Sequence, residues 1–327
     1  MIRSAWLLAF IMLAALPAGA AQTLHFTIPS IQLFEAPYLV AEAKGYFAEQ
    51  GLDVQFVTAN GGVATPALMS GSVDASASSA SALTAIMKGA PLRIVLVQQN
   101  RPVYQLWSTR PDIRALADLK GKQVAVETRG GSDEIAARIA FQAAGMNPDD
   151  VTYFPLGTAN AASAISGQLP AFVLATSDIS QLRVAGLLGK AHLVLDYAKI
   201  EQMPQNGLAV SQKLITDNPA LLDKMLRAIV KGLLYARAYK QQTIDIIVKA
   251  GSTASVAAIA ADYEQYMATV TPRLEVSTDV AKADLDVHAT LLAMPRDQEP
   301  PLDQIYNFAP LRAAEAEVSA SGWKPKP

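Results

Sequence analysis

The chain has 327 residues, of which 51 % are hydrophobic and 17 % are charged, so wholesale disorder is excluded and two domains of ordinary size are expected. The formal net charge is −2 and the pI is near 6.0, which gives no reason to expect nucleic acid or an anionic membrane as a partner.

The N-terminus has the pattern of a secretory signal. Arg3 is the only charge before an apolar run at 5–16, and Ala18-Gly19-Ala20 supplies the small residues that a signal peptidase needs. The run is too short to span a bilayer comfortably. We expect residues 1–21 to be a cleaved signal peptide and the mature protein to be periplasmic, with an uncleaved anchor as the alternative. The chain has no cysteine, which excludes disulfides and a lipid-attachment cysteine.

Strand and helix patterns alternate through the first two thirds of the mature chain. Expected strands are 24–28, 54–57, 73–77, 93–97, 123–126, 151–156, 172–175, 191–195 and 206–210, and expected helices include 37–44, 64–69 and 133–144. From Pro219 the chain becomes helical, with apolar residues at helical spacing, followed by a further helix at 254–267. Such alternation favours mainly parallel sheets with helices on their faces.

A half-unit nearly recurs about a hundred residues along the chain. Residues 70–75 (SGSVDA) resemble residues 166–171 (SGQLPA), and each segment precedes a short strand and a serine, Ser78 or Ser177. We therefore predict an α/β fold with two similar lobes and a ligand between them. Lobe I is expected to comprise 22–109 and 205–327, and lobe II 110–204, with the chain crossing near 109–112 and 203–207.

Three segments together carry a family resemblance: the Ala36-Pro37-Tyr38 motif leading to Gly51-Leu52-Asp53-Val54, the segment 67–75, and Asp118-Leu119-Lys120-Gly121-Lys122 before a strand. From about residue 24 to 239 the chain resembles the nitrate/sulfonate/taurine-type substrate-binding proteins of ABC importers, a branch that also contains binders of pyrimidine precursors. One departure is Pro170, which stands where the first half-unit has Asp74.

The resemblance implies a type II periplasmic-binding-protein fold with two hinge crossings, a small-molecule ligand in the cleft, and an ABC permease in the inner membrane as partner. We also expect a monomer that binds no nucleic acid. No P-loop, G-x-S-x-G motif or dinucleotide-binding glycine pattern is present, and the three histidines are scattered, so we expect no catalytic residue, cofactor or metal.

In open α/β sheets a ligand lies beyond the carboxyl ends of the strands. The turns at those ends and the second crossing supply the candidate ligand-binding residues, which are Phe34, Glu35, Asn60, Gly61, Ser78, Ser79, Asn100, Thr128, Arg129, Gly130, Ser132, Asn160, Ser177, Asp178 and Asn206.

Arg129 is the sharpest candidate, because it lies in a glycine-rich turn at a helix start, where a guanidinium and free N–H groups could hold a carboxylate or sulfonate; the alternative is a solvated surface arginine. Ser78 and Ser79 are expected to cap a helix, and one of them to meet the ligand. Glu35 and Asp178 are expected to accept hydrogen bonds from the ligand, to pair with Arg129 or to cap a helix, and Phe34 to be core or cleft wall.

The expected function is that of a non-enzymatic solute-binding component of an ABC importer, which captures a small organic anion, sulfonate or carboxylate, including aromatic ones. Two alternatives remain: an enzyme of the same fold from pyrimidine or menaquinone biosynthesis, and a ligand-sensing adaptor. The secretory signal and the lack of cysteine argue against the enzyme.

Overall fold

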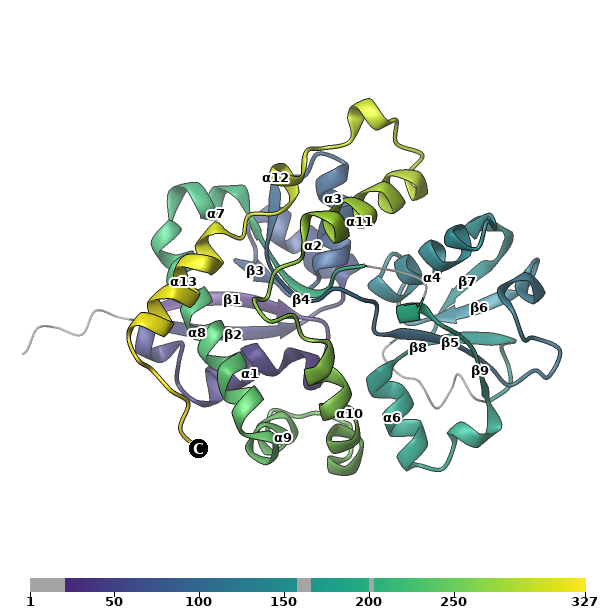
Figure 1. Ribbon diagram of the computed structural model, residues 1–327, viewed down its shortest axis with the longest axis horizontal. Coiled ribbons are helices and arrows are strands. Elements are labelled where there is room, and N and C mark those ends of the chain that lie inside the picture. The colour runs from purple at the N-terminus through teal and green to yellow at the C-terminus, as the bar shows by residue number, and fades with distance from the viewer. Residues whose placement is uncertain (1–20, 158–165, 200–202) are drawn as a thin grey trace, which may run out of the picture.

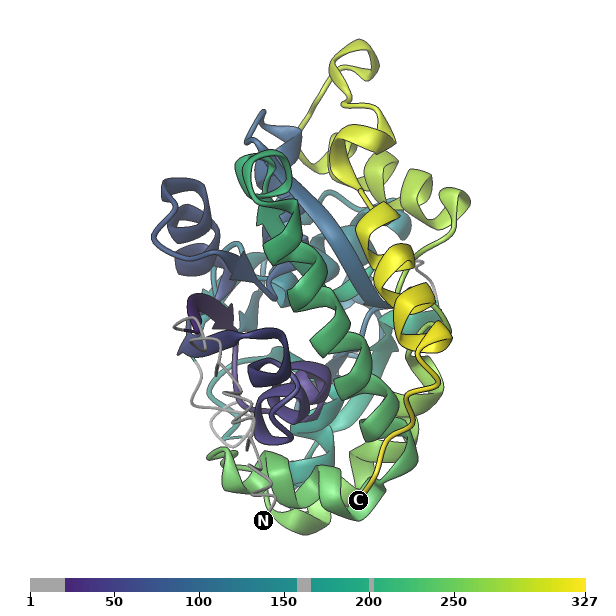
Figure 2. The same cartoon turned by 90° about the vertical axis from the view of Figure 1, so that its left-hand side faces the viewer.

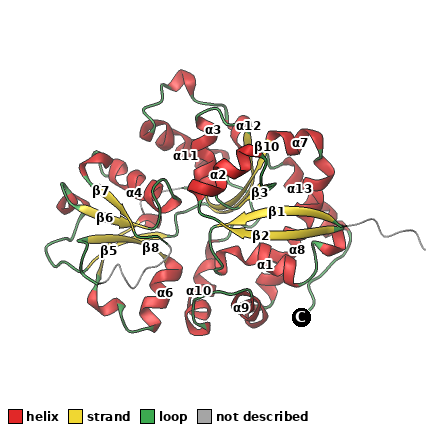
Figure 3. Cartoon of the chain, turned by 180° about the vertical axis from the view of Figure 1, so that it is seen from behind, coloured by secondary structure: helices red, strands yellow, loops and turns green. Residues whose placement is uncertain are grey.

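The computed structural model describes residues 21–157, 166–199 and 203–327, which form two lobes, each with a five-stranded sheet between helices (Figures 1 and 3). Lobe I contains β1 (Gln22–Ile28), α1 (Ala36–Ala43), β2 (Leu52–Thr58), α2 (Gly61–Ser70), β3 (Ala75–Ser76), α3 (Ser79–Met87), β4 (Leu92–Gln99), β10 (Gln205–Ser211), α7 (Gln212–Asp217), α8 (Pro219–Ala238), α9 (Lys240–Lys249), α10 (Val256–Thr269), α11 (Thr278–Leu291), α12 (Leu302–Ile305) and α13 (Ala309–Ala320). Lobe II contains β5 (Tyr104–Ser108), β6 (Gln123–Val126), α4 (Ser132–Ala143), β7 (Thr152–Pro155), β8 (Ala171–Ala175), α6 (Thr176–Val184) and β9 (His192–Asp196).

The two sheets share one layout. Their strand orders are β2-β1-β3-β10-β4 and β7-β6-β8-β5-β9, and in each sheet four strands run one way while β10 or β5 runs the other way. The reversed strand is in each case the one that follows a crossing between the lobes. The two-lobe α/β fold expected from the sequence is therefore the observed one.

The recurring half-unit occupies equivalent places in the two lobes. Gly71 and Gly167 both adopt left-handed backbone conformations, with φ of 77° and 84°, and each precedes the strand that lies third in its sheet, β3 or β8. Glycine adopts this conformation without the steric cost that a side chain brings. The sequence similarity of the two half-units thus corresponds to a structural one.

The first crossing lies earlier than the sequence suggests. β4 ends at Gln99 and β5 begins at Tyr104 in the second sheet, so the chain crosses at 100–103 and not at 109–112. Residues 104–108 were not expected to be a strand, because the segment is short and its polar and apolar residues do not set it apart from a loop. The second crossing leads into β10, which begins at Gln205, within the expected 203–207. Arg101 joins the two crossings by donating to the Ala198 carbonyl at 2.8 Å.

The helical C-terminal part of the chain covers lobe I. α8 runs along the lobe with α13 beside it (Figure 2). The apolar residues of α8 that recur at helical spacing are all buried: Leu222, Met225, Leu226, Ile229, Leu233 and Ala236. The last residues are also held, since the Tyr239 hydroxyl donates to the Pro325 carbonyl and Trp323 packs edge-on against Tyr46. In the described part of the chain, no helix combines the length and apolarity needed to cross a bilayer.

The lobes touch each other at both ends of the space between the sheets. α10 packs against α6 at one end, and α3 and α11 contact α4 at the other. At the second end, Ala80 of α3 joins the apolar core of lobe II, and Val287 and Leu291 of α11 pack against that core. The described chain is therefore in a conformation in which the lobes meet.

Candidate functional site

Two adjoining cavities lie between the lobes, at the carboxyl ends of the parallel strands. Their volumes are about 290 Å³ and about 70 Å³, and they share Pro29, Ser30 and Gln32 from lobe I with Glu127 and Asp178 from lobe II. Each of these residues follows closely on a strand, as the rule for open α/β sheets requires. We treat the two cavities as one interlobe cleft.

Both cavities have mixed apolar and polar walls. The apolar residues of the larger cavity come from both lobes: Pro29 and Ile31 from lobe I, and Ala125, Val126, Leu156, Phe172, Val173 and Leu174 from lobe II. The smaller cavity lies around the helix starts and is lined by Asn60, Ser78, Ser79, Thr128, Ser132, Asp133 and Asn206, among others. A ligand that combines apolar surface with hydrogen-bonding groups would fit such walls.

Three carboxyl groups line the cleft, and the pKa of each is higher than that of a free carboxyl group. Burial, with the neighbouring Asp133 and Asp178, raises the pKa of Glu127 to about 7. Burial likewise raises the pKa of Asp133 to about 6, against backbone N–H groups that stabilise its charged form. The pKa of Asp178 is also raised by burial to about 6.

The described walls of the two cavities supply no cationic side chain to balance these carboxyl groups. Among the described residues, neither cavity has a lysine, arginine or histidine in its wall. The sequence of 158–165 and of 200–202 contains none of these residue types either. The described chain also shows no cluster of three or more His, Cys, Asp or Glu residues placed to hold a metal ion. The cleft is therefore an acceptor-rich environment.

Two of the three acidic groups occupy helix starts. Asp133 Oδ2 accepts the Glu127 N–H at the start of α4, and Asp178 Oδ2 accepts the Ala175 N–H at 3.2 Å at the start of α6. These are the positions at which free N–H groups and the helix dipole would otherwise favour an anion. In lobe II each of these two helix starts thus already carries a carboxyl group of the protein itself.

The structure brings most of the sequence-predicted residues to the cleft. Those that line it are Phe34, Asn60, Gly61, Ser78, Ser79, Thr128, Ser132, Asp178 and Asn206. Asn206 has a left-handed backbone (φ 52°), which asparagine tolerates, and its side-chain amide donates to Gln99 Oε1.

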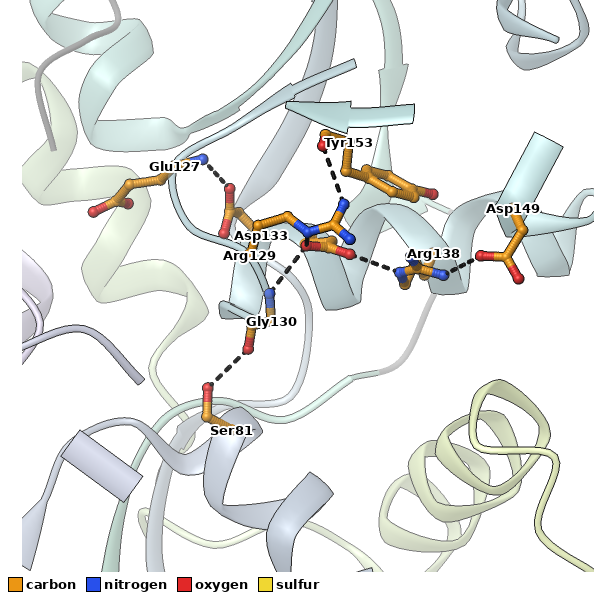
Figure 4. A network of polar contacts seen from close by, with 9 residues as sticks. Ser81, Glu127, Arg129, Gly130, Asp133, Arg138, Asp149 and Tyr153 are labelled. Atoms are coloured by element: carbon orange, nitrogen blue, oxygen red, sulfur yellow. Dashed lines mark hydrogen bonds and ion pairs between the residues drawn. The ribbon is translucent and has the colours of Figure 1, made fainter. Parts of the chain in front are cut away.

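Arg129 does not line the cleft. Its Nη1 donates to the Tyr153 carbonyl at 3.1 Å, its Nε lies 3.8 Å from Glu134 Oε2, and its side chain is 58 % exposed (Figure 4). Glu134 is buried and also accepts from Arg138 at 2.8 Å. The guanidinium of Arg129 thus balances the buried carboxylate of Glu134 in its own lobe. Its position is close to the alternative considered from the sequence, a solvated surface arginine.

The serine cluster acts differently from the expected caps. Ser78 occupies the N-cap position of α3 but its side chain makes no capping bond. Instead, Ser79 Oγ accepts the Gly207 N–H at 3.0 Å, which ties α3 to the second crossing. Ser81 Oγ donates to the Gly130 carbonyl at 3.3 Å, which joins lobe I to lobe II (Figure 4). The serines hold the hinge and the closed arrangement together.

The remaining candidates lie off the cleft or outside the described residues. Glu35 is buried in lobe I near Tyr38, and burial raises its pKa well above the usual range. Ser177 lies in the contact between α6 and α10 and not in the cleft. Asn100 is in the first crossing and lines neither cavity, and Gly130 meets Ser81 through its carbonyl. Asn160 lies outside the described residues.

Sequence reasoning missed several residues that line the cleft, namely Pro29, Ser30, Gln32, Thr58, Tyr104, Glu127, Asp133, Leu156 and Phe172. Pro29, Glu127 and Leu156 directly follow a strand, so the rule that selected Thr128 would also have selected Glu127, one residue earlier. Tyr104 required knowledge of β5, and Asp133 appeared in the sequence only as a favourable residue at a helix start.

Two α/β lobes, two crossings and a cleft at the strand ends define the class of two-lobe solute-binding proteins with the periplasmic-binding-protein fold. Residues 34–243 match the family model described as NMT1/THI5 like, and the chain belongs to this family. The match covers the cleft residues from Phe34 to Asn206, whereas Pro29, Ser30 and Gln32 precede it.

The chain is also similar to individual proteins in sequence or in fold. The chain is 32 % identical over 225 residues to a riboflavin-binding protein of Chloroflexus aurantiacus, over 67 % of this chain and 63 % of the relative. In fold it is similar to a protein of Bordetella bronchiseptica, with a TM-score of 0.77, 22 % identity and coverage of 92 % and 99 % of the two chains. It is also similar to the alkanesulfonate-binding protein of Xanthomonas axonopodis pv. citri bound to MOPS, with a TM-score of 0.68, 20 % identity and the same coverages.

Proposed function

We propose that this protein is the periplasmic solute-binding component of an ABC importer and that it captures an uncharged or cationic nitrogen heterocycle in the interlobe cleft. It works as a monomer without catalysis and delivers the ligand to a membrane permease. The observation that carries the ligand class is the set of three carboxyl groups, Glu127, Asp133 and Asp178, which line a cleft without a lysine, arginine or histidine in its described wall.

The sequence led us to expect an organic anion, and the charge of the cleft argues against it. A sulfonate or carboxylate would have to approach three acidic groups, and the helix starts of α4 and α6 already accommodate carboxylates. A ligand with N–H or O–H groups would instead supply the donors that these acceptors lack.

The apolar residues of the larger cavity support a ligand with a ring system. Phe172, Val126 and Leu174 of lobe II and Pro29 and Ile31 of lobe I all line this cavity, so apolar contacts are available from both lobes. The relative from Chloroflexus aurantiacus is a riboflavin-binding protein, and riboflavin is an uncharged heterocycle with several O–H donors and an N–H donor. Its similarity to this chain supports the heterocycle class, whereas the alkanesulfonate-binding neighbour is similar in fold at low identity.

The mechanism follows from the two lobes. Ligand contacts shared by Glu127 and Asp178 on one side and by Ser30, Gln32 and Asn60 on the other exist only when the lobes meet. The ligand therefore shifts the open–closed equilibrium by its difference in affinity for the two forms.

A ligand screen tests the proposal. In a thermal-shift assay at pH 7, we expect riboflavin or a 4-aminopyrimidine to raise the melting temperature as its concentration increases. A ligand concentration of a hundred times Kd should add about 2.7 kcal/mol to the free energy of unfolding. Taurine, an alkanesulfonate and nitrate should give no shift. Isothermal titration calorimetry then measures Kd, and a shift with the anions alone would overturn the proposed ligand class.

A further inference from the structure

The contact between α10 and α6 contains a buried polar cluster around Asp262. The cluster borders the cleft at Gln32, but Asp262 itself lines neither of the two cavities of the cleft. α10 belongs to lobe I and α6 to lobe II, and the two helices lie side by side at one end of the cleft (Figures 1 and 3). This contact is made only when the lobes meet.

Asp262 of α10 is the central residue of the cluster. It is 4 % exposed, and the Thr176 hydroxyl of α6 donates to its carboxyl across the contact. Its second oxygen, Oδ1, has no hydrogen-bond partner among the described residues. The same is true of Gln32 Oε1 and Ser177 Oγ, which line with Asp262 a cavity of about 10 Å³.

Two of the three unpartnered atoms, Gln32 Oε1 and Asp262 Oδ1, are acceptors when the carboxyl is ionised. The Ser177 hydroxyl supplies a single O–H donor, so it cannot satisfy both of them. A protonated Asp262 would supply an O–H donor to this cavity while its other oxygen still accepts from Thr176. Burying it neutral also avoids the cost of burying an unpaired charge.

Asp178 of α6 is the charged group that acts on Asp262 from the facing helix, and it opposes ionisation of Asp262. One turn along α10, Tyr266 lies near Glu35 of the turn 33–35 and near Arg237 of α8, which have opposite charges. On α9, Lys240 is paired with Glu264, which is largely exposed. Burial, with Asp178, raises the pKa of Asp262 to about 6, against the hydrogen bond from Thr176.

We propose that Asp262 is a proton-dependent latch: a protonated Asp262 stabilises the closed arrangement of the lobes, and an ionised Asp262 favours opening. This goes beyond the capture of a ligand, because it sets the open–closed equilibrium of the empty protein. A drop in pH would favour closure and retention, and a rise in pH would favour opening and release.

The expected size of the pH effect on lobe closure follows from the linkage between proton binding and closure. When the lobes separate, Asp262 is hydrated and its pKa returns towards the ordinary value near 4, so between pH 8 and pH 5 the closing equilibrium should shift about 10-fold towards the closed form through this group. Glu127 and Asp178 in the cleft add their own pH dependence, so the test is the difference between wild type and a variant at 262.

The experiment measures closure without any ligand, so its failure and the failure of the proposed ligand class are distinguishable. The chain has no cysteine, which allows specific spin labels at Val63→Cys in α2 and Phe154→Cys in β7, both exposed and on opposite lobes. Double electron–electron resonance at pH 5 and pH 8 then gives the fractions of short and long distances.

We expect the wild-type labels to show more of the short distance at pH 5. Asp262→Asn keeps the shape and supplies a permanent donor, so it should be closed at pH 8 to the extent that wild type is at pH 5, with a pH dependence about 10-fold smaller. Glu264→Gln, on the same helix but exposed, should behave as wild type. Equal pH dependence in wild type and Asp262→Asn, or no pH dependence in wild type, would overturn the latch.

Discussion

Arg129 and Asp178 both lie near the start of a helix in lobe II: Arg129 in the turn before α4, and Asp178 in the first turn of α6. Of the two, only Asp178 lines the cleft. Arg129 contributes to a network that holds Glu134, whose side chain is 6 % exposed and which accepts from Gly130 N–H and from Arg138 (Figure 4). A buried carboxylate needs such partners, because burying an unpaired charge is costly. The guanidinium of Arg129 therefore lies beside Glu134, on the outside of the lobe, and not in the cleft.

Substitutions at these two residues should separate their roles. Arg129→Ala should change the affinity for the heterocycle by less than 2-fold, since its guanidinium does not reach the cavity wall. Asp178→Asn keeps the shape but removes the charged acceptor, and should weaken binding by about 1.5–3 kcal/mol. Titration calorimetry of both variants against wild type measures this, and a large loss with Arg129→Ala alone would return the anion hypothesis.

At the scale of elements, α8 and α1 pack closely enough to exclude a methyl group. A Cβ built on Gly232 of α8 would lie 2.0 Å from the Pro37 carbonyl oxygen of α1. α1 leads on from the turn 33–35, and Phe34 in that turn reaches the cleft. The position of one cleft wall therefore depends on this contact between helices.

Gly232→Ala should destabilise lobe I although alanine is the better helix former by about 1 kcal/mol. Overpacking of this kind costs about 1–3 kcal/mol, so the free energy of unfolding should fall in urea denaturation. Gly62→Ala in α2 is the matched control, because its Cβ would meet only ordinary contacts at 3.4 Å and beyond. A stabilised Gly232→Ala would show that α1 can move away from α8.

At the scale of the whole molecule, buried carboxyl groups set the pH dependence of stability. Asp133 and Asp262 are almost fully buried, and burial raises the pKa of each to about 6. The folded state then binds more protons than the unfolded state between about pH 4 and pH 7. Stability from these groups is present at low pH and lost as the pH rises through 6.

We therefore expect the ligand-free protein to be more stable at pH 5 than at pH 8, by about 1 kcal/mol for each of the two residues. His288 acts in the same direction: burial lowers its pKa, but Asp284 outweighs this and raises it. Denaturant unfolding at the two pH values measures the difference. A protein that is more stable at pH 8 would mean that these carboxyls remain solvated in the folded state.

Local patterns in the sequence were sufficient to predict the two-lobe architecture. The alternation of strands and helices, the helical spacing of apolar residues in 219–238 and the recurrence of 70–75 at 166–171 are all properties of short segments, because side-chain periodicity depends on the local backbone. The strand-end rule then selected some of the residues that line the cleft, among them Asn60, Thr128 and Asp178, and left out others such as Glu127.

Only the tertiary structure decided what the cleft can hold. Which way the Arg129 side chain points, how Glu127, Asp133 and Asp178 gather, and where α10 meets α6 depend on contacts between residues far apart in the chain. Burial and neighbouring charge, which set the pKa values of those carboxyls, arise only when the chain folds. For this reason the sequence predicted a binding protein of two lobes, while the folded chain decided that its cleft is acidic.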